Sequence, residues 1–252
     1  MGRDWIHTAL ASQSRFLIEA RVGPRTLEMA AQLVASVAMV CCVTRTLRRL
    51  LLLIDNHLPY PNAILQVLGV IRHRRRKRGR GRIKSPDLKA PPGLWVGVVE
   101  KVRTATGKLL RVRTHALFGS RKRSMVRLIK RLKLGKQINT AHMERLNGTL
   151  RTQQQARLGR RTRNLSRRGV ALQWSLWLWR DLYNWIHPHH SLEGRTPAMV
   201  LGLASVPWTV QQYVREAVHV SDLMRQIRAE EREIWLTSAL AARKRSKLLP
   251  TS

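Results

Sequence analysis

The pattern of apolar and polar positions near the N-terminus predicts a β-hairpin followed by a helix. Two short runs typical of strands, "DWIHTALAS" and "RFLIEARVG", are separated by Gln13 and Ser14. Gly23 and Pro24 end the second run. The next segment, "RTLEMAAQLVASVAMVCCV", has the length and the alanine-rich composition of a helix.

The next segments predict a buried strand and a second helix. "LLLLID" is an uninterrupted apolar run that ends at Asp55, which is typical of a strand covered on both faces. "NHLPYP" predicts a turn, and "NAILQVLG" predicts a short helix closed by Gly69. A hairpin, a helix, a strand and a helix in this order predict an α/β fold whose sheet is covered by helices.

The pattern then changes at a run of cations. In residues 72–84, nine of the thirteen positions are Lys or Arg, so we expect a solvated basic linker over 72–92. A hairpin insertion is predicted over 93–118, around its "TGK" turn. "SRKRSMVRLIKRLKLG" predicts a basic amphipathic helix. The apolar stripe of this helix is Met125, Leu128, Ile129 and Leu132.

Two further helices are predicted after this hairpin. The helix that begins near Thr140 carries an apolar stripe that can anchor it on a sheet, made of Met143, Leu146 and Leu150. "ALQWSLWLWRDLYNWIH" is apolar on nearly every side and stops at Pro188, so it predicts a core helix. Its tryptophans Trp174, Trp177 and Trp185 have helix-core spacing, and Asp181 is expected to pair with a basic neighbour such as Arg180.

Composition adds a partner class to this picture. The chain has 252 residues and 44% apolar content, enough for a folded body. Against 48 Lys and Arg there are 14 Asp and Glu, and a formal net charge of +34 makes nucleic acid the default partner. The expected phosphate contacts in the two basic runs are Arg74, Arg75, Arg76, Lys77, Arg78, Arg160, Arg161 and Arg163. Charge alone does not distinguish an enzyme from a binding protein.

The cysteines and the longest apolar segment bear on location. Cys41 and Cys42 are adjacent and supply neither a disulfide framework nor a CxxC metal site, which fits a reducing intracellular setting. The apolar segment 27–43 is interrupted by Glu28 and Gln32, so a buried helix is favoured over a membrane span. No signal peptide is visible. We therefore expect a cytoplasmic protein without a membrane partner.

Glu144 is the single carboxylate of "NTAHMERLNGTLR". In a helix, residues seven apart lie within about 20° of each other and about 10 Å apart along the axis, so Glu144 and Arg151 share a face. Gly148 between them leaves that face uncrowded. One interpretation is an ordinary surface pair, and the other is a carboxylate held beside open space with a cation nearby.

Asp55 also has two interpretations. An Asp after a strand and before "NH" and two prolines is commonly a turn residue that caps local backbone groups. Alternatively, Asp55 lies at the carboxyl end of a central strand, where open α/β sheets bind their ligands. Metal binding by His187, His189 and His190 is disfavoured, because Pro188 disrupts their helical presentation and no nearby acid or cysteine completes a site. His142 is not expected to be a ligand, because it projects about 160° away from Glu144.

The motifs "INTAHMERLNGTLR", "LYNWIHPHHSLEGRTPAMVLGL" and "PWTVQQYV" resemble the C-terminal half of DDE-type insertion-sequence transposases. Upstream, "WIHTALASQSRFLIEARVGPRT" and "LLLIDNHLPYPNAILQVLG" are similar to the first strands and the second-acid segment of that group. The resemblance runs from about residue 4 to about residue 215. It implies an integrase-related, RNase H-like catalytic domain over 1–215, followed by a charged helical tail over 216–252.

The resemblance implies a triad of carboxylates that binds two Mg²⁺ ions for cleavage and transfer of DNA strands. Matched by motif, Asp55 is the second acid, Glu144 the third, and Arg151 the basic residue two turns on. Ala11 stands where the family places its first Asp. Asp4 cannot replace it, because it lies about 23 Å away along a strand and points to the opposite face.

Two functions are therefore expected. The first is a DDE-type transposase with DNA as its partner, working as a homo-oligomer on DNA and with one Mg²⁺ ion or none, because the first acid is missing. The alternative is a non-catalytic basic nucleic-acid-binding protein. An unrelated RNA binder would leave Asp55 and Glu144 far apart. Many transposases carry an N-terminal module for end recognition, and we expect none here because the first strand begins at once.

Overall fold

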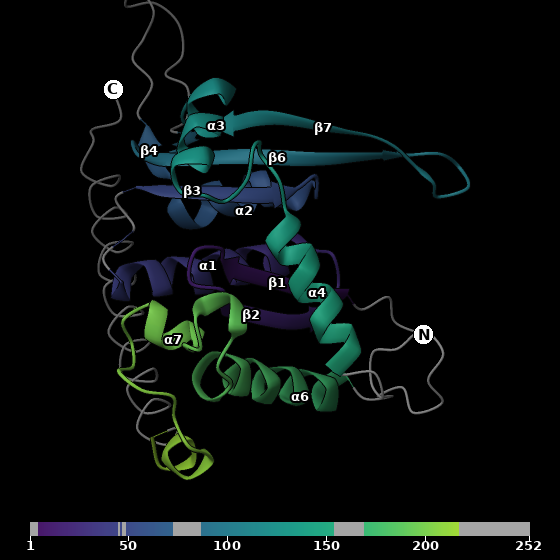
Figure 1. The fold of residues 1–252 in the computed structure, drawn as a ribbon. Coiled ribbons are helices and arrows are strands. Elements are labelled where there is room, and N and C mark those ends of the chain that lie inside the picture. Colours follow the sequence, from purple (N-terminus) through teal and green to yellow (C-terminus); the bar gives the residue numbers. More distant parts are fainter. Residues whose placement is uncertain (1–4, 45, 47–48, 73–86, 154–168, 217–252) are drawn as a thin grey trace, which may run out of the picture. The chain divides into compact units, whose positions relative to one another are not determined.

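The computed structural model describes residues 5–44, 46, 49–72, 87–153 and 169–216 (Figure 1). The chain divides into a unit of residues 1–205 and a second unit of residues 206–252. In the second unit, residues 210–216 are helical, and Thr209 and Gln212 cap this helix reciprocally through their side chains and backbone N–H groups. The tail predicted over 216–252 lies outside the described residues beyond residue 216.

The predicted N-terminal hairpin is present. β1 (Trp5–Ala11) pairs antiparallel with β2 (Phe16–Gly23), and the register shifts at Ala9 and Leu10. In the turn, Arg15 has a backbone φ of 60°, in the left-handed region that favours glycine. Among the described strands, β1 pairs only with β2, so the hairpin forms a sheet of its own.

The following segments form the predicted helix, strand and helix. α1 (Leu27–Val43) begins where the Thr26 hydroxyl accepts a hydrogen bond from the backbone N–H of Met29. β3 (Leu50–Asp55) leads into α2 (Pro59–Leu68). The prediction of a turn through "NHLPYP" was wrong in its second half, because α2 already begins at Pro59. Proline is tolerated there, since the first N–H groups of a helix have no partner within the helix.

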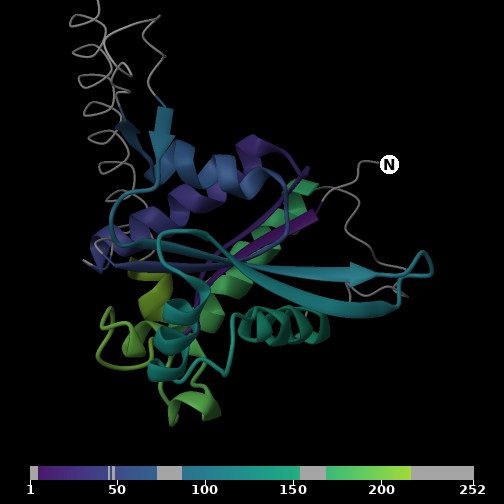
Figure 2. The same ribbon diagram turned by 90° about the horizontal axis from the view of Figure 1, so that it is seen from above.

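The larger sheet is mixed. β3 runs parallel to β6 (Leu94–Arg103), and β6 runs antiparallel to β7 (Leu109–Phe118), which confirms the hairpin predicted over 93–118. The β6–β7 hairpin extends beyond the end of β3 (Figure 2). β4 (Val70–Arg72) pairs with β5 (Asp87–Lys89), which lies inside the linker predicted over 72–92, and the Arg72 guanidinium binds the Asp87 carboxylate.

Helices cover both faces of this mixed sheet. Leu52 and Ile54 of β3 pack with apolar residues of α1 and α2. Leu51 and Leu53 point to the other face, where Met125 and Ile129 of α3 (Lys122–Arg131) are fully buried. The β3 side chains therefore contact apolar groups on both faces, as predicted, although they are only partly buried.

The remaining helices pack on the N-terminal hairpin. Leu146 and Leu150 of α4 (Ala141–Gln153) share a core with Leu17 and Ala20 of β2. Leu176 and Trp179 of α6 (Gly169–Asp181) complete this core. The chain then passes through a π-helix, η2 (Leu182–Ile186), a 3₁₀ turn, η3 (His190–Leu192), and α7 (Pro197–Val200). The predicted apolar stripe of α4 does anchor it on a sheet.

The prediction of an all-round core helix at α6 was wrong. Trp174 is 65% exposed and Leu178 is 55% exposed. α6 meets β2 along one side only, and Trp177 points its indole N–H to the Glu19 carboxylate at 3.0 Å. Asp181 pairs with Arg180, as expected. In the described part of the chain, no helix is long and apolar enough to cross a membrane.

Candidate carboxylate site

Asp55 is the last residue of β3 and is exposed to solvent. Its backbone carbonyl accepts a hydrogen bond from the N–H of His57 at 2.8 Å. Within the described ranges, no group donates a hydrogen bond to the Asp55 carboxylate. The carboxylate therefore does not cap the backbone of the turn that follows, and it is open to a ligand.

Glu144 lies in the first turn of α4, and two neighbouring groups bind its carboxylate. The Lys101 ammonium lies 2.5 Å from Oε1, and the Thr140 hydroxyl donates to the same oxygen at 2.8 Å. The hydrogen bond from Lys101 has the largest effect on the pKa of Glu144 and lowers it, and the hydrogen bond from Thr140 lowers it further. The carboxylate is therefore ionised at neutral pH, while its side chain stays 52% exposed.

The register of the mixed sheet places the two acids at the same edge. Asp55 lies opposite Val99 on the parallel strand β6, and Lys101 is two residues further along β6. Side chains two apart point to the same face, so Asp55 and Lys101 share the face covered by α3. Strand spacing and rise put their Cα atoms about 8 Å apart. Lys101, which binds Glu144, therefore lies near the end of β3 that carries Asp55.

The loop before α4 fixes where Glu144 lies. Ile138 is 1% exposed and packs against Gly97 of β6, where a Cβ atom would lie 3.2 Å from Ile138. The missing side chain of Gly97 therefore gives Ile138 its place against the sheet. Asn139 follows, and its side-chain oxygen accepts a hydrogen bond from the N–H of Ala141 at 3.1 Å. A buried anchor and a polar cap thus set the start of α4 beside β6.

The space beside Glu144 is open, as the sequence predicts. A Cβ atom added to Gly148 would have no neighbour within 4 Å. Arg151 is exposed on the same helix, and helical geometry puts it on the Glu144 side. The helix face around Glu144 is therefore uncrowded and has Arg151 nearby, as predicted. The sequence did not indicate that Lys101 would also bind Glu144.

Ala11 ends β1 and lies opposite Phe16 beside the hairpin turn. The residue at the position of the missing first acid is therefore close to the turn that joins β1 to β2. Asp4 lies outside the described residues, which begin at Trp5. The structure thus offers no carboxylate from the body of β1 to join Asp55 and Glu144.

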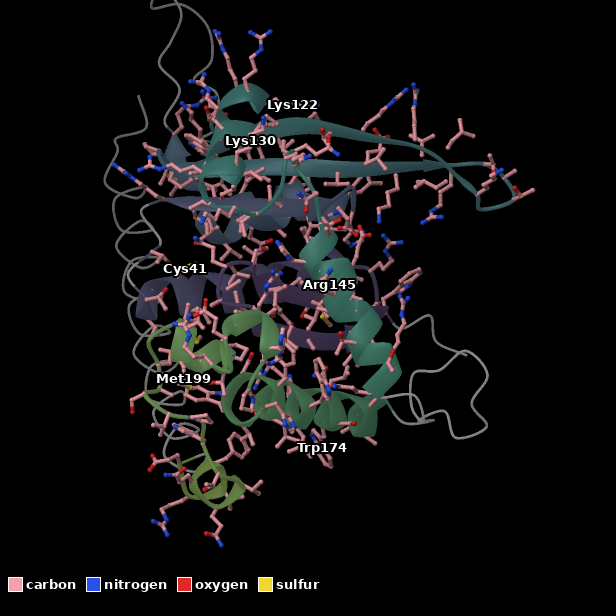
Figure 3. The ribbon with its side chains drawn as sticks, in the orientation of Figure 1. Cys41, Lys122, Lys130, Arg145, Trp174 and Met199 are labelled. Carbon is pink, nitrogen blue, oxygen red and sulfur yellow. The ribbon has the colours of Figure 1, made fainter. Side chains whose placement is uncertain are left out.

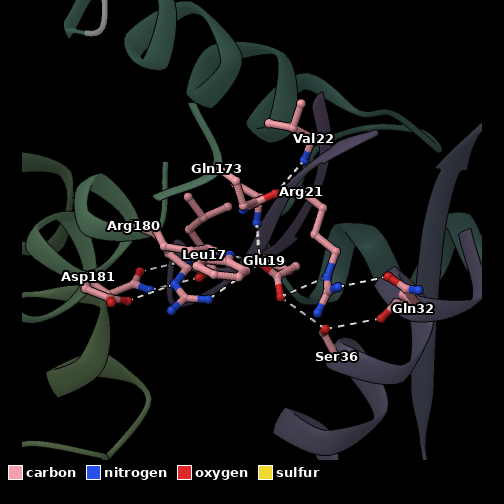
Figure 4. Close-up of polar contacts among 12 residues, drawn as sticks. Leu17, Glu19, Arg21, Val22, Gln32, Ser36, Gln173, Arg180 and Asp181 are labelled. Atoms are coloured by element: carbon pink, nitrogen blue, oxygen red, sulfur yellow. Dashed lines mark hydrogen bonds and ion pairs between the residues drawn. The ribbon is translucent and has the colours of Figure 1, made fainter. Parts of the chain in front are cut away.

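Glu19 on β2 is a buried acid that the sequence did not single out. Its side chain is 7% exposed and lies between Arg21 at 3.3 Å and Arg180 at 3.5 Å (Figure 4). Ser36 and the Trp177 indole also donate to it. Because these groups already occupy its oxygens, Glu19 ties β2 to α1 and α6 rather than offering a metal site.

Two buried histidines lie near Asp55. The rings of His7 and His57 are 6.2 Å apart, and in the described part of the chain neither Nε2 atom has a hydrogen-bond partner. Burial lowers the pKa of His57, so its ring is neutral at neutral pH. Among the described residues, no cluster of three or more His, Cys, Asp and Glu could hold a metal ion.

The predicted phosphate contacts have different outcomes. Arg151 is exposed, whereas the eight cations predicted in the two basic runs lie outside the described residues. α3 adds cations that the sequence analysis assigned only to an amphipathic helix (Figure 3). The exposed ones are Lys122, Arg123, Arg127, Lys130 and Arg131. α3 covers the same sheet face on which Asp55 lies.

Comparisons of this chain with known proteins found no similar protein. No family model matches the chain, and no match was found among curated proteins or among solved structures.

Replacing Lys101 by methionine is expected to raise the pKa of Glu144 toward its usual value of about 4.3, because its main ionic partner is lost. The pKa can be followed by carboxyl ¹³C NMR with Glu144→Gln for assignment. Lys108→Met, which removes a charge from the turn of the same hairpin, serves as the control. An unchanged Glu144 signal in Lys101→Met would show that the pair does not form in solution.

Proposed function

We propose that this chain is the catalytic-domain part of a DDE-type insertion-sequence transposase that binds DNA and has lost its first acid. In this proposal the α/β fold is RNase H-like, and Asp55 and Glu144 are the surviving metal ligands. The observation that carries the proposal is the register of β3 and β6. It brings Asp55 to the sheet face and edge where Lys101 binds Glu144.

The donor set suits one hard cation. Two carboxylates with open space beside them can hold Mg²⁺, which usually takes one or two carboxylates and keeps several waters. A bound ion would supply Lewis acidity toward a phosphodiester. A two-ion centre does not fit, since Ala11 offers no ligand. Lys101 already neutralises Glu144, so a cation must compete with this ammonium for the carboxylate.

The chain's own cations support binding of a polyanion. α3 packs its apolar side on Leu51 and Leu53 of β3 and exposes its Lys and Arg side chains to solvent, and Arg151 lies on the Glu144 side of α4. Such contacts position a phosphate backbone without reading its sequence. They support DNA binding whether or not the carboxylate site cuts.

A second candidate function is DNA binding without catalysis, and the position of Ala11 favours it. With only two of three acids, the native chain is expected to bind DNA but not to nick it. Its affinity should fall with salt, with a slope in log–log form of about −0.9 for each phosphate contact on duplex DNA. Binding measured by fluorescence anisotropy between 50 and 300 mM salt, over which the Debye length falls from about 14 Å to about 6 Å, checks this expectation.

The proposed lineage is tested by restoring the acid. We expect Ala11→Asp to nick supercoiled DNA in Mg²⁺ or Mn²⁺ at a rate at least about 10-fold above the native chain. Glu144→Gln in the Ala11→Asp background is the matched control and should return the rate to background.

Two results would contradict the lineage proposal. Equal nicking by the native chain and Ala11→Asp would mean that the missing acid is placed wrongly. Nicking that survives Glu144→Gln would mean that this carboxylate does not serve the reaction.

A further inference from the structure

A cleft of about 610 Å³ opens on the side of α4 that faces the hairpin turn. Its walls come from the turn between β1 and β2, from α4, from the end of α6 with η2, and from the segment after η2. The polar residues that line it include Arg15, His142, Arg145, Gln153, Tyr183 and His187. We call it the Arg15–Arg145 cleft.

Two arginines line this cleft, and none of its described lining residues is a carboxylate. Arg15 and Arg145 both line it, and the charge of Arg145 acts on Arg15. Burial is the main cause that lowers the pKa of Arg15, and the like charge of Arg145 lowers it further. Arg15 still carries its charge at neutral pH. Two guanidinium groups facing one partly desolvated space favour an anion between them.

The backbone and a neighbour hold Arg15 toward the cleft. Its φ of 60° is one that glycine or asparagine adopts more readily than arginine. A hydrogen bond joins its guanidinium to Nδ1 of His142 in the first turn of α4. The backbone conformation of this turn thus does not explain why the residue is an arginine. Its guanidinium does supply a positive charge to the cleft.

Aromatic rings and polar side chains make the rest of the cleft. Trp179 and Tyr183 stack with centroids 5.0 Å apart, and the edge of His189 meets Tyr183 at 4.3 Å. The Trp179 indole N–H donates to Gln153 at 2.7 Å and fixes that amide. His142 projects about 160° around α4 from Glu144, so the cleft lies on the opposite side of the helix from the carboxylate site.

We infer that the Arg15–Arg145 cleft binds one phosphate-bearing nucleotide, taken free or from a single DNA strand. Its volume is that of a small-molecule site, which is too small for duplex DNA. The two guanidinium groups would hold the phosphate, and the fixed aromatic wall and amide would meet the sugar and base. The choice of DNA as the source of the strand rests on the proposed function, whereas the preference for a phosphate does not.

The test is equilibrium dialysis of the full chain with labelled dTMP at 150 mM salt, with thymidine as the ligand without phosphate. We expect dTMP to bind and thymidine to bind at least about 10-fold more weakly. Arg15→Asn should lose at least about 10-fold in dTMP affinity and keep or raise its stability, because asparagine tolerates the backbone conformation of the turn. Arg113→Asn removes one exposed charge from β7 and should change dTMP affinity less than about 2-fold.

Competition identifies the source of the nucleotide. Displacement of dTMP by a short oligo(dT) would assign the cleft to a strand, and dTMP binding that oligo(dT) does not disturb would assign it to a free nucleotide. Equal losses in Arg15→Asn and Arg113→Asn, equal binding of thymidine, or no dTMP binding at all would overturn the inference. Glu144→Gln should leave dTMP binding unchanged, so failure of the carboxylate site and failure of the cleft are distinguishable.

Discussion

Replacing Glu19 by alanine is expected to lower the free energy of unfolding by about 3 kcal/mol. The carboxylate is buried between Arg21 and Arg180 and accepts hydrogen bonds from Ser36 and Trp177 (Figure 4). Its removal leaves two guanidinium groups close together without their shared counter-charge. Each arginine keeps one other partner, which is Gln32 for Arg21 and Asp181 for Arg180. The expected loss of free energy therefore lies at the low end of the range for a buried ion pair that loses one member.

Urea unfolding at pH 7, followed by far-UV circular dichroism, measures this change. Glu28→Ala is the matched control, because it removes the same charge from the exposed first turn of α1 and should cost less than about 0.5 kcal/mol. A similar loss in both variants would mean that net charge, and not the buried cluster, sets the stability.

Replacing Ile138 by alanine is expected to cost about 3 kcal/mol of unfolding free energy. Ile138 is 1% exposed and packs with Met125 and Ile129 of α3 and against Gly97 of β6. The truncation leaves a cavity where the chain turns into α4. Because the same anchor places Glu144 beside Lys101, we also expect the pKa of Glu144 to rise toward its usual value.

Ile71→Ala is the control for Ile138→Ala, since Ile71 is 63% exposed and its truncation should cost less than about 0.5 kcal/mol. Denaturant unfolding and carboxyl NMR give the two readouts. A destabilised Ile138→Ala in which the Glu144 pKa is unchanged would show that the cap at Asn139 positions α4 without the buried anchor.

Local periodicity was enough to predict most of the described elements. The alternation in the N-terminal hairpin, the apolar run of β3 and the 3.6-residue stripes of α3 and α4 each reflect which side of one element is buried. The apolar pattern of α6 was misleading, because it does not say how many sides find a partner. Trp174 and Leu178 remain exposed on the side of α6 that meets none of the described strands.

The carboxylate site was predictable only in part. Asp55 and Glu144 could be chosen because Asp55 ends an apolar strand and Glu144 is the single carboxylate in the segment that opens a helix. Lys101 could not, since it lies 43 residues from Glu144 and meets it only because the loop before α4 packs on β6. Arg15 was missed for a similar reason: its role depends on the turn conformation and on His142, far along the chain.

The position of β7 has a consequence for handling the protein. β7 is an outer strand of the mixed sheet, and Leu109, Leu110 and Val112 on it are exposed. Arg111 and Arg113 alternate with these apolar residues, so two copies repel each other when their edges meet. Concentrated salt or a bound polyanion screens that repulsion. The salt used to strip nucleic acid from a preparation should therefore also promote edge-to-edge aggregation of the purified chain.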